Sequence, residues 1–264
     1  MNQVLITIQI NTIIQYNKQS NKMNQSHIIK AHHMEIGKVT ISDTKTNENG
    51  GKSIYLNYDN HPIIIQTPVT TLPYNMSIYD KGDYPKYSIE LSFRDLDTDS
   101  KLKAFHDSFN KLDDMIVEHG VKNSMPWFKK KKAHKDVVLA LFSPHIKLSR
   151  DKETGEADGK YPPNMKIKLP VRDNVPGFKI YDFDKNELDR PIEELFVKGA
   201  RVQTLIKCSG IWIIGGKFGC SWNVSQIMVD APSTIQNYSF IDDSGGEEEE
   251  ESDSDGDDLV DDSD

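Results

Sequence analysis

The last 23 residues of the chain, 242–264, cannot contribute to a folded core. They read DDSGGEEEEESDSDGDDLVDDSD and contain fourteen Asp or Glu residues but no Lys or Arg. Like charges at this density repel one another, and the segment offers almost no apolar surface to bury. We therefore predict a disordered, solvated acidic tail, and any fold must be built from the residues before it.

Setting the tail apart changes the charge of what remains. The whole chain has a formal net charge of −9, from 32 basic and 41 acidic residues. Residues 1–241 hold all 32 basic residues and only 27 acidic ones, so this body is mildly basic. The asymmetry favours a body that binds polyanions and a tail that competes for that surface or recruits partners. Charge alone is equally consistent with a tail that only maintains solubility.

Little in the chain suggests catalysis or a bound metal. Cys208 and Cys220 are too few for a disulfide framework and lack the spacing of zinc ligands, which suggests a reducing compartment. No nucleotide-binding, zinc-protease, hydrolase or kinase motif occurs. No stretch has the roughly 18 uninterrupted apolar residues of a membrane helix. We predict a protein that is not an enzyme, needs no cofactor or metal, and does not bind membranes.

The body is predicted to be mainly β. Residues 87–93, YSIELSF, and 165–171, MKIKLPV, alternate apolar and polar side chains as half-buried strands do. Residues 137–149, VVLALFSPHIKLS, are interpreted as another long strand. Two long strands around Gly215 and Gly216 predict a hairpin over residues 200–229.

One amphipathic helix is predicted in the middle of the strand order. It begins at Asp97 or Thr98 and ends at Gly120. Its apolar residues recur every three or four positions and form a stripe for packing on a sheet: Leu102, Phe105, Phe109, Leu112 and Ile116. Short strands with one inserted helix favour a closed or partly closed barrel. We expect an Asn/Gln/Ile-rich extension at 1–33, one domain at 34–238 and the tail at 239–264.

Two aromatic rings followed by a run of amines stand after the predicted helix, in MPWFKKKKAHKD (residues 125–136). Rings can stack on bases and ammonium groups can neutralise phosphates, as single-strand binding requires. The alternative is a buried tryptophan beside solvated lysines, and we favour binding. The predicted contacts are Trp127, Phe128, Lys129, Lys130, Lys131, Lys132 and Lys135.

The last hairpin and the loop before it supply further candidates. By alternation Trp212 shares a face with Ile206 and Cys208, which predicts burial, and at least one of Trp212 and Trp222 should belong to the core. For the loop residues, an ordinary charged hairpin is as consistent as binding. The additional predicted nucleic-acid contacts are Lys147, Arg150, Tyr161, Lys166, Lys168, Lys207, Trp212 and Lys217.

The order of these elements carries a resemblance. The chain presents, in this order, the strand YSIELSF, the helix TDSKLKAFHDSFNKLDDMIVEHG, the run VVLALFSPHIKL, the hairpin GARVQTLIKCSGIWIIGGKFGCSWNVSQIMV and an acidic C-terminus. This order resembles the single-stranded DNA-binding proteins of short-tailed coliphages and their relatives in large nucleo-cytoplasmic DNA viruses. The resemblance covers roughly residues 50–231 and the tail, and no short motif carries it.

The resemblance implies an OB fold, an elaborated five-stranded Greek-key barrel with one inserted helix. It implies a protein that coats single-stranded DNA in replication, recombination or repair with weak sequence preference. An aromatic residue in the last hairpin would stack on DNA, and Trp212 lies nearest that position. A bulge near Gly210 would reconcile this role with the alternation.

For the tail, the resemblance implies competition with DNA and recruitment of a replicative polymerase or helicase. The family's tail ends on an aromatic residue, whereas here Leu259 and Val260 precede DDSD, so a docking role is less specified than DNA mimicry. The residues assigned to partner binding are Glu247, Glu248, Glu249, Glu250, Glu251, Asp257, Asp258, Leu259 and Val260. A homodimer, and a viral replication site in the host cytoplasm or the virion itself, are further implications.

Two other functions remain open at this stage. A histone-chaperone-like or scaffold protein would use the acidic tail to bind basic proteins, and its body would only oligomerise. An OB-fold RNA-binding protein would differ only in its substrate, because no residue here specifies contact with a 2′-hydroxyl.

Overall fold

The structure is a computed structural model that describes residues 27–46, 52–82 and 84–232. The chain divides after Pro232, and everything described belongs to the first unit. The predictions for the acidic tail, and for the extension before residue 27, lie outside the described residues. No helix in the described ranges combines the length and the apolar character needed to cross a bilayer.

The first half of the chain supplies short strands and the central helix. Its elements are β1 (Ile28–Lys30), η1 (Ala31–His33), η2 (Ile36–Lys38), β2 (Val39–Ile41), β3 (Lys45–Thr46), β4 (Lys52–Ser53), β5 (Leu56–Tyr58), β6 (His61–Pro62), β7 (Ile64–Gln66), β8 (Thr70–Thr71), β9 (Ser77–Tyr79), β10 (Lys86–Ser92) and α2 (Ser100–Lys122).

The second half adds short helices and the two longest strands. Its elements are α3 (Ser124–Phe128), α4 (Lys135–Leu141), β11 (Phe142–Ser143), β12 (Ile146–Lys147), β13 (Asn164–Leu169), β14 (Val171–Arg172), β15 (Val175–Pro176), β16 (Lys179–Tyr181), α5 (Ile192–Leu195), β17 (Arg201–Ile214) and β18 (Lys217–Asp230).

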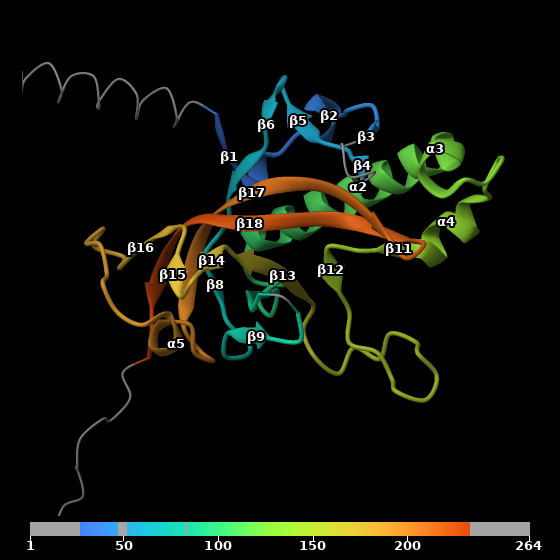
Figure 1. Ribbon diagram of the computed structural model, residues 1–264. Helices are drawn as coiled ribbons and strands as arrows, with labels where there is room; N and C mark the ends of the chain where they lie inside the picture. Colours follow the sequence, from blue (N-terminus) through green and yellow to red (C-terminus); the bar gives the residue numbers. More distant parts are fainter. Residues whose placement is uncertain (1–26, 47–51, 83, 233–264) are drawn as a thin grey trace, which may run out of the picture. The chain divides into compact units, whose positions relative to one another are not determined.

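The main sheet curls back on itself. Its strands follow the order β1-β7-β17-β18-β13-β10-β9, and β8 pairs with β17 while also contacting β10. Strand β8 therefore links β17, in the middle of this order, to β10, near its end, and the sheet closes as in a small barrel. The β17–β18 hairpin runs along the whole unit with α2 beside it (Figure 1). The predicted fold class, a mainly β OB-type barrel with one inserted amphipathic helix, is confirmed.

Helix α2 packs against the barrel through the predicted stripe. Phe105, Phe109, Leu112 and Ile116 are fully buried, and burying each such side chain contributes about 1.5–3 kcal/mol. The helix begins later than predicted, at Ser100, because the N-cap is Asp99 and not Asp97 or Thr98: its carboxylate accepts hydrogen bonds from the backbone N–H groups of Lys101 (2.8 Å) and Leu102 (3.0 Å).

The predicted end of α2 at Gly120 is wrong. The helix continues to Lys122, and Gly120 is a buried helical residue. A Cβ atom at Gly120 would lie 3.2 Å from Val138, 3.3 Å from Trp127 and 3.4 Å from Phe218. The glycine therefore allows α3, α4 and β18 to approach the helix closely, and it does not terminate it.

The long strand predicted over residues 137–149 is also wrong. Residues 135–141 form α4, and only β11 and β12 are extended. Val138 is fully buried against α2, whereas Val137 and Leu139 are 39% and 45% exposed. The apolar run that suggested a strand is thus divided between a buried helical face and solvent, and Pro144 lies between the two short strands.

The residues just before position 34 are part of the folded unit. Ile28–Lys30 pairs in parallel with β7, and Ala31 and Met34 lie in the core. The assigned extension, residues 1–33, therefore includes the three residues of β1, which complete one edge of the sheet, and η1, which packs beside α2.

A bulge in β17 reorients the tip of the last hairpin. The register with β18 shifts between Cys208 and Gly210, where a bulge was predicted. Gly210 has a φ of +100°, and a Cβ there would lie only 2.5 Å from the carbonyl oxygen of Ile54. Glycine is needed at this position because a bulkier residue would clash with that backbone.

Candidate nucleic-acid interface

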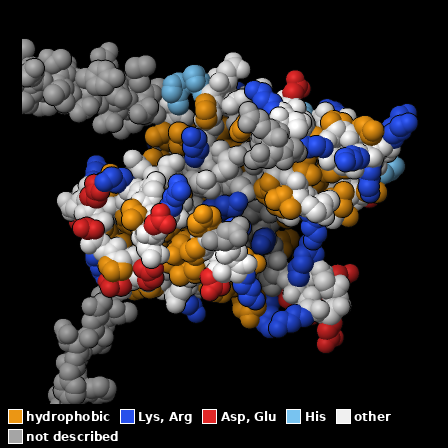
Figure 2. All heavy atoms as spheres, in the orientation of Figure 1, with side chains coloured by type: hydrophobic (Ala, Val, Ile, Leu, Met, Phe, Trp, Pro, Cys, Tyr) orange, Lys and Arg blue, Asp and Glu red, His pale blue; other side chains and the backbone are white. Residues whose placement is uncertain are grey.

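A cleft of about 540 Å³ lies at the tip of the β17–β18 hairpin. Strands β12, β13, β17 and β18 and the loop between β11 and β12 contribute to it. It brings together five predicted contacts that are far apart in the sequence: Lys147, Lys166, Lys168, Trp212 and Lys217. Figure 2 shows a hollow between the α3–α4 region and the loop after β12, with Lys and Arg side chains along it.

Trp212 lies on the outer face of the hairpin because of the bulge. It pairs with Gly219, and Lys207 pairs with Asn223. Residues 219 and 223 are separated by two alternations of a regular strand, so Trp212 shares a face with Lys207 and not with Cys208. The prediction of burial from alternation was wrong: Trp212 is half-buried, whereas Trp222 belongs to the core at 1% exposure.

Gly219 makes room for the Trp212 ring. A Cβ at position 219 would lie 2.8 Å from Cζ2 of Trp212 and 2.9 Å from the carbonyl oxygen of Ser143. The indole therefore lies over bare backbone at the floor of the cleft. This arrangement leaves the ring partly accessible while it remains packed.

A buried hydrogen-bonded pair holds one wall of the cleft. His145 is buried, its Nδ1 is hydrogen-bonded to the Asp113 carboxylate, and its backbone N–H donates to Asp113 at 3.0 Å. Asp113 belongs to α2, so the loop that carries Ser143 and Pro144 is fixed to the central helix. A cleft with a fixed wall requires less ordering when a ligand binds.

The lysines of the cleft are available for an anionic ligand. Lys147, Lys166, Lys168 and Lys217 are exposed, and none forms an ion pair with another described residue. No carboxylate from the described ranges lines the cleft. Desolvation, followed by the neighbouring charge of Lys86, lowers the pKa of Lys168 below its usual value. An incoming phosphate would favour the charged form of this amine.

The two cysteines lie beneath the same face. Their Sγ atoms are 3.5 Å apart, and both thiols are free. The contact between the two thiols and their burial raise the pKa of Cys220 well above its usual value. Among the described residues, no cluster of His, Cys, Asp or Glu is suited to a metal ion.

The structure corrects the role predicted for Trp127. This residue is only 3% exposed, its Nε1 donates to Oγ1 of Thr44 at 3.1 Å, and its ring packs against Phe218 with centroids 5.7 Å apart. It is a core residue and cannot stack on a base without unfolding α3. Phe128 is half-buried and also packs on Phe218.

The remaining predicted contacts are exposed and lie outside the lining of this cleft. The α3–α4 loop, which we call the basic loop, carries Lys129, Lys130, Lys131, Lys132 and Lys135. In the loop after β12, Arg150 donates to the carbonyl of Gly155, and Tyr161 is 58% exposed. Lys207 is exposed on β17. The assigned tail residues, 247–251 and 257–260, lie outside the described residues.

The sequence did not reveal the wall of the cleft. Ser143, Pro144 and His145 were placed in a strand, and no pattern links them to Trp212. The only available signal was Pro144, which argues against a continuous strand.

The chain matches the model of one protein family. A model described as a family of unknown function, DUF5871, matches residues 90–242, which is more than half of the chain. This region includes α2, β13 and the β17–β18 hairpin, and therefore most of the cleft. No curated protein matches the chain significantly.

Solved structures give distant similarities. One is to the single-stranded DNA-binding protein from bacteriophage Enc34 in complex with single-stranded DNA, with 14% identity, a TM-score of 0.41, and coverage of 76% of this chain and 99% of that one. Another is to gp2.5, a single-stranded DNA-binding protein encoded by bacteriophage T7, with 12% identity, a TM-score of 0.42, and coverage of 68% and 97%. Neither similarity identifies a ligand or a contact residue of this chain.

Proposed function

We propose that this chain, which belongs to the family of unknown function DUF5871, binds single-stranded DNA. One observation carries the proposal: the fold gathers four unpaired lysines around a partly accessible tryptophan in one cleft. These residues come from four different strands, so their convergence is a property of the fold and not of a charged segment.

The chemistry of the cleft suits an unpaired strand. A base can stack on the indole of Trp212, which is worth about 1–3 kcal/mol by alanine substitution and depends little on base identity. Lys147, Lys166, Lys168 and Lys217 would contact flanking phosphates. Four such contacts predict a slope of about −3 for the logarithm of the affinity against the logarithm of the salt concentration.

Other predicted contacts would extend this surface. In this proposal the basic loop, Lys207 and the loop that carries Arg150 and Tyr161 attract the strand around the cleft. The acidic tail competes with DNA for the lysines and recruits a replicative polymerase or helicase. The protein would act in viral DNA replication, recombination or repair.

Titration with oligo-dT over a range of salt concentrations tests the proposal. Full-length protein and a chain ending at residue 241 should both bind at low salt, and the shorter chain should bind more tightly because the competing anion is gone. A tailless chain that ignores oligo-dT at low salt contradicts the proposal.

Two further binding measurements distinguish single-stranded DNA binding from the two rival functions. Histone binding that depends on the tail, without DNA binding, would support a histone-chaperone-like protein. A matched RNA oligomer that displaces oligo-dT at equal concentration would favour an RNA-binding protein.

A further inference from the structure

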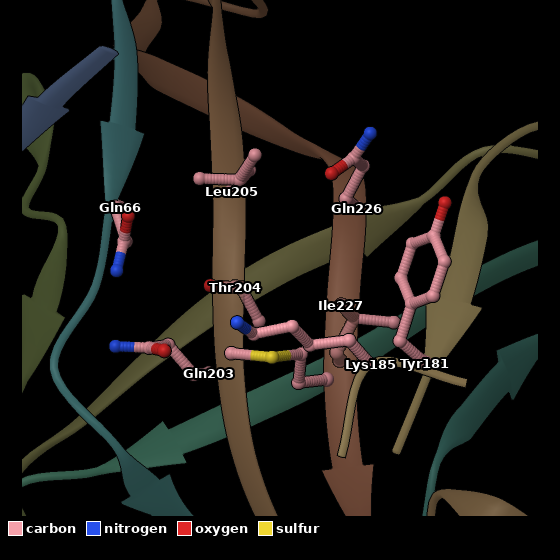
Figure 3. A pocket seen from close by; sticks show the side chains of 9 residues that line it. Gln66, Tyr181, Lys185, Gln203, Thr204, Leu205, Gln226 and Ile227 are labelled. Atoms are coloured by element: carbon pink, nitrogen blue, oxygen red, sulfur yellow. The ribbon is translucent and has the colours of Figure 1, made fainter. Parts of the chain in front are cut away.

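A second pocket lies on the same hairpin, away from its tip. It has a volume of about 370 Å³, and β7, β16, β17 and β18 contribute to it. Figure 3 shows Gln66 and Gln203 on one side and Tyr181 and Gln226 on the other. Buried Thr204 and Ile227 lie beneath it, and among the described residues Lys185 is the only charged one in its lining.

Three polar side chains of this pocket make no hydrogen bond within the part of the chain that the structure describes, whereas the Thr204 hydroxyl is hydrogen-bonded to that of Thr67 at 3.2 Å. Among the described residues, no hydrogen bond is made by the side-chain amides of Gln66 and Gln226 or by the Tyr181 hydroxyl. Gln203, by contrast, is held by its hydrogen bond to the carbonyl of Thr67 at 3.0 Å. A free amide presents a donor and an acceptor side by side, which is the pattern found on the edges of nucleobases.

The charge of the pocket is also unbalanced. The Lys185 ammonium group makes no ion pair with a described residue, whereas nearby Lys179 is paired with Glu187. No carboxylate of the described structure lines the pocket. An amide-rich pocket with one free cation suits a nucleotide better than it suits an apolar or a cationic ligand.

The strand register connects this pocket to the cleft. Leu205 pairs with both Gln66 and Gln226, so these three side chains share one face. Two residues further along β17, Lys207 pairs with Asn223, and Asn223 pairs with Lys168 of the cleft. The register with β18 shifts twice along this stretch, between Leu205 and Ile206 and between Cys208 and Gly210. Leu205 and Lys207 are still two positions apart on β17, and Lys207 shares a face with Trp212 across the second shift, so one outer face continues from the pocket to Trp212.

The spacing suits a single bound strand. Nine residues separate Gln203 from Trp212, which corresponds to about 30 Å at the rise of an extended chain. At the spacing of about 3.4 Å per nucleotide in a B-form strand, this is about nine nucleotides. Site sizes of OB folds are about 4–16 nucleotides, so one strand can span both positions.

We propose that the pocket is a second base-binding subsite for the same single strand. The Tyr181 ring contacts the face of a base, the amides of Gln66 and Gln226 hydrogen-bond to its edge, and Lys185 contacts a flanking phosphate. This inference rests on the proposed function. It adds to that function a defined length for the bound strand and a source of modest base preference.

Oligomer length provides the test. Affinity is measured by fluorescence anisotropy for oligo-dT of about four and about sixteen nucleotides, which occupy one subsite or span both. The variants are Tyr181→Ala, Tyr181→Phe and, as a matched control, Tyr84→Ala, since Tyr84 is 72% exposed and lies outside both pockets. Thermal melting verifies that each variant is folded.

We expect Tyr181→Ala to weaken binding of the longer oligomer about tenfold, as for one stacked base, and binding of the shorter one less than twofold. Tyr181→Phe, which keeps the ring, and Tyr84→Ala should bind like the wild type. If the wild type binds the longer oligomer and Tyr181→Ala binds it equally well, the subsite is wrong and the proposed function stands. If the wild type binds neither oligomer, both proposals fail.

Discussion

Trp127 and Trp212 both lie near lysines, but Trp127 is near them along the sequence and Trp212 is near them in space. Trp127 is followed directly by Phe128 and by the four lysines 129–132, yet its ring is buried and hydrogen-bonded within the fold. Trp212 has no lysine within four residues along the chain, yet four lysines surround it in space. The tryptophan with the more basic sequence context is therefore the one that cannot reach a ligand.

The two tryptophans differ in exposure because Trp127 is positioned by a short helix and Trp212 by strand pairing. A short helix turns Trp127 inward against β18, while its lysines continue into solvent. Strand pairing instead places residues from distant segments side by side, and the bulge at Gly210 decides which face Trp212 occupies. In a barrel, strand register is a better guide to a binding site than adjacency in the chain.

The largest expected effect is on stability and comes from Trp127→Ala. Deleting a buried tryptophan costs about 3–5 kcal/mol in the free energy of unfolding. The change also leaves the Thr44 hydroxyl without its partner. Urea denaturation measures the loss, and oligo-dT affinity at a temperature where the variant is folded should change less than twofold. A stable Trp127→Ala variant with lost DNA binding would reverse the assignment of the two tryptophans.

A pair of charge-matched triple variants compares the lysines of the two regions. Replacing Lys166, Lys168 and Lys217 by Gln should weaken oligo-dT binding and lower the salt slope by about two, because three phosphate contacts are lost. Replacing Lys129, Lys130 and Lys131 by Gln removes the same charge from the basic loop. It should change the slope by less than one, since these side chains are not part of the cleft at the hairpin tip.

Equal slopes for the two triple variants would show that binding depends on net charge and not on the cleft. Circular dichroism and thermal melting of both variants provide the control for folding.

A smaller effect is expected from pH. The pKa of Lys168 lies below its usual value of about 10.5, chiefly through desolvation. Phosphate binds the charged form of Lys168, so its contribution to the affinity is present below this lowered pKa and declines as the pH rises through it. Because the folded pKa is the lower one, folding releases a proton in the window between the two values, and stability increases with pH there.

Lys168→Arg is the variant that isolates this contribution, because arginine remains charged throughout. Its oligo-dT affinity, measured from neutral to alkaline pH at constant ionic strength, should fall later than that of the wild type, by a few-fold at most. Superimposable pH profiles would mean that Lys168 does not contact the strand.

Part of this architecture could be predicted from the sequence. The α2 stripe, the alternating strands and the Gly215–Gly216 hairpin follow from local periodicity and from residues with special backbone requirements. The bulge near Gly210 was predicted for another reason, because the role that the family resemblance implies for Trp212 conflicted with strand alternation. Residues 137–149 could not be assigned in this way, because tertiary contact between Val138 and α2 outweighs the apolar run.

The sequence allowed the residues of the candidate site to be predicted, but not the cleft in which they meet. Lys147, Lys166 and Lys168 were predicted as one cluster and Lys217, with Trp212, as another, and strand pairing brings the two clusters together in one cleft. The His145 wall depends on a buried contact with Asp113, 32 residues away, which no local pattern records.

The intrinsic fluorescence of the three tryptophans tests the central claim most directly. Trp127 and Trp222 are buried at 3% and 1% exposure, and although Trp222 also lines the cleft, Trp212 is the one tryptophan that is partly accessible there. Titration with oligo-dT should quench the emission of the wild type and of Trp127→Phe, because a stacked base quenches the indole that it contacts. In Trp212→Phe the quenching should disappear. Quenching that persists in Trp212→Phe, or that is lost in a folded Trp127→Phe, would contradict the assignment of the cleft as the site of base stacking.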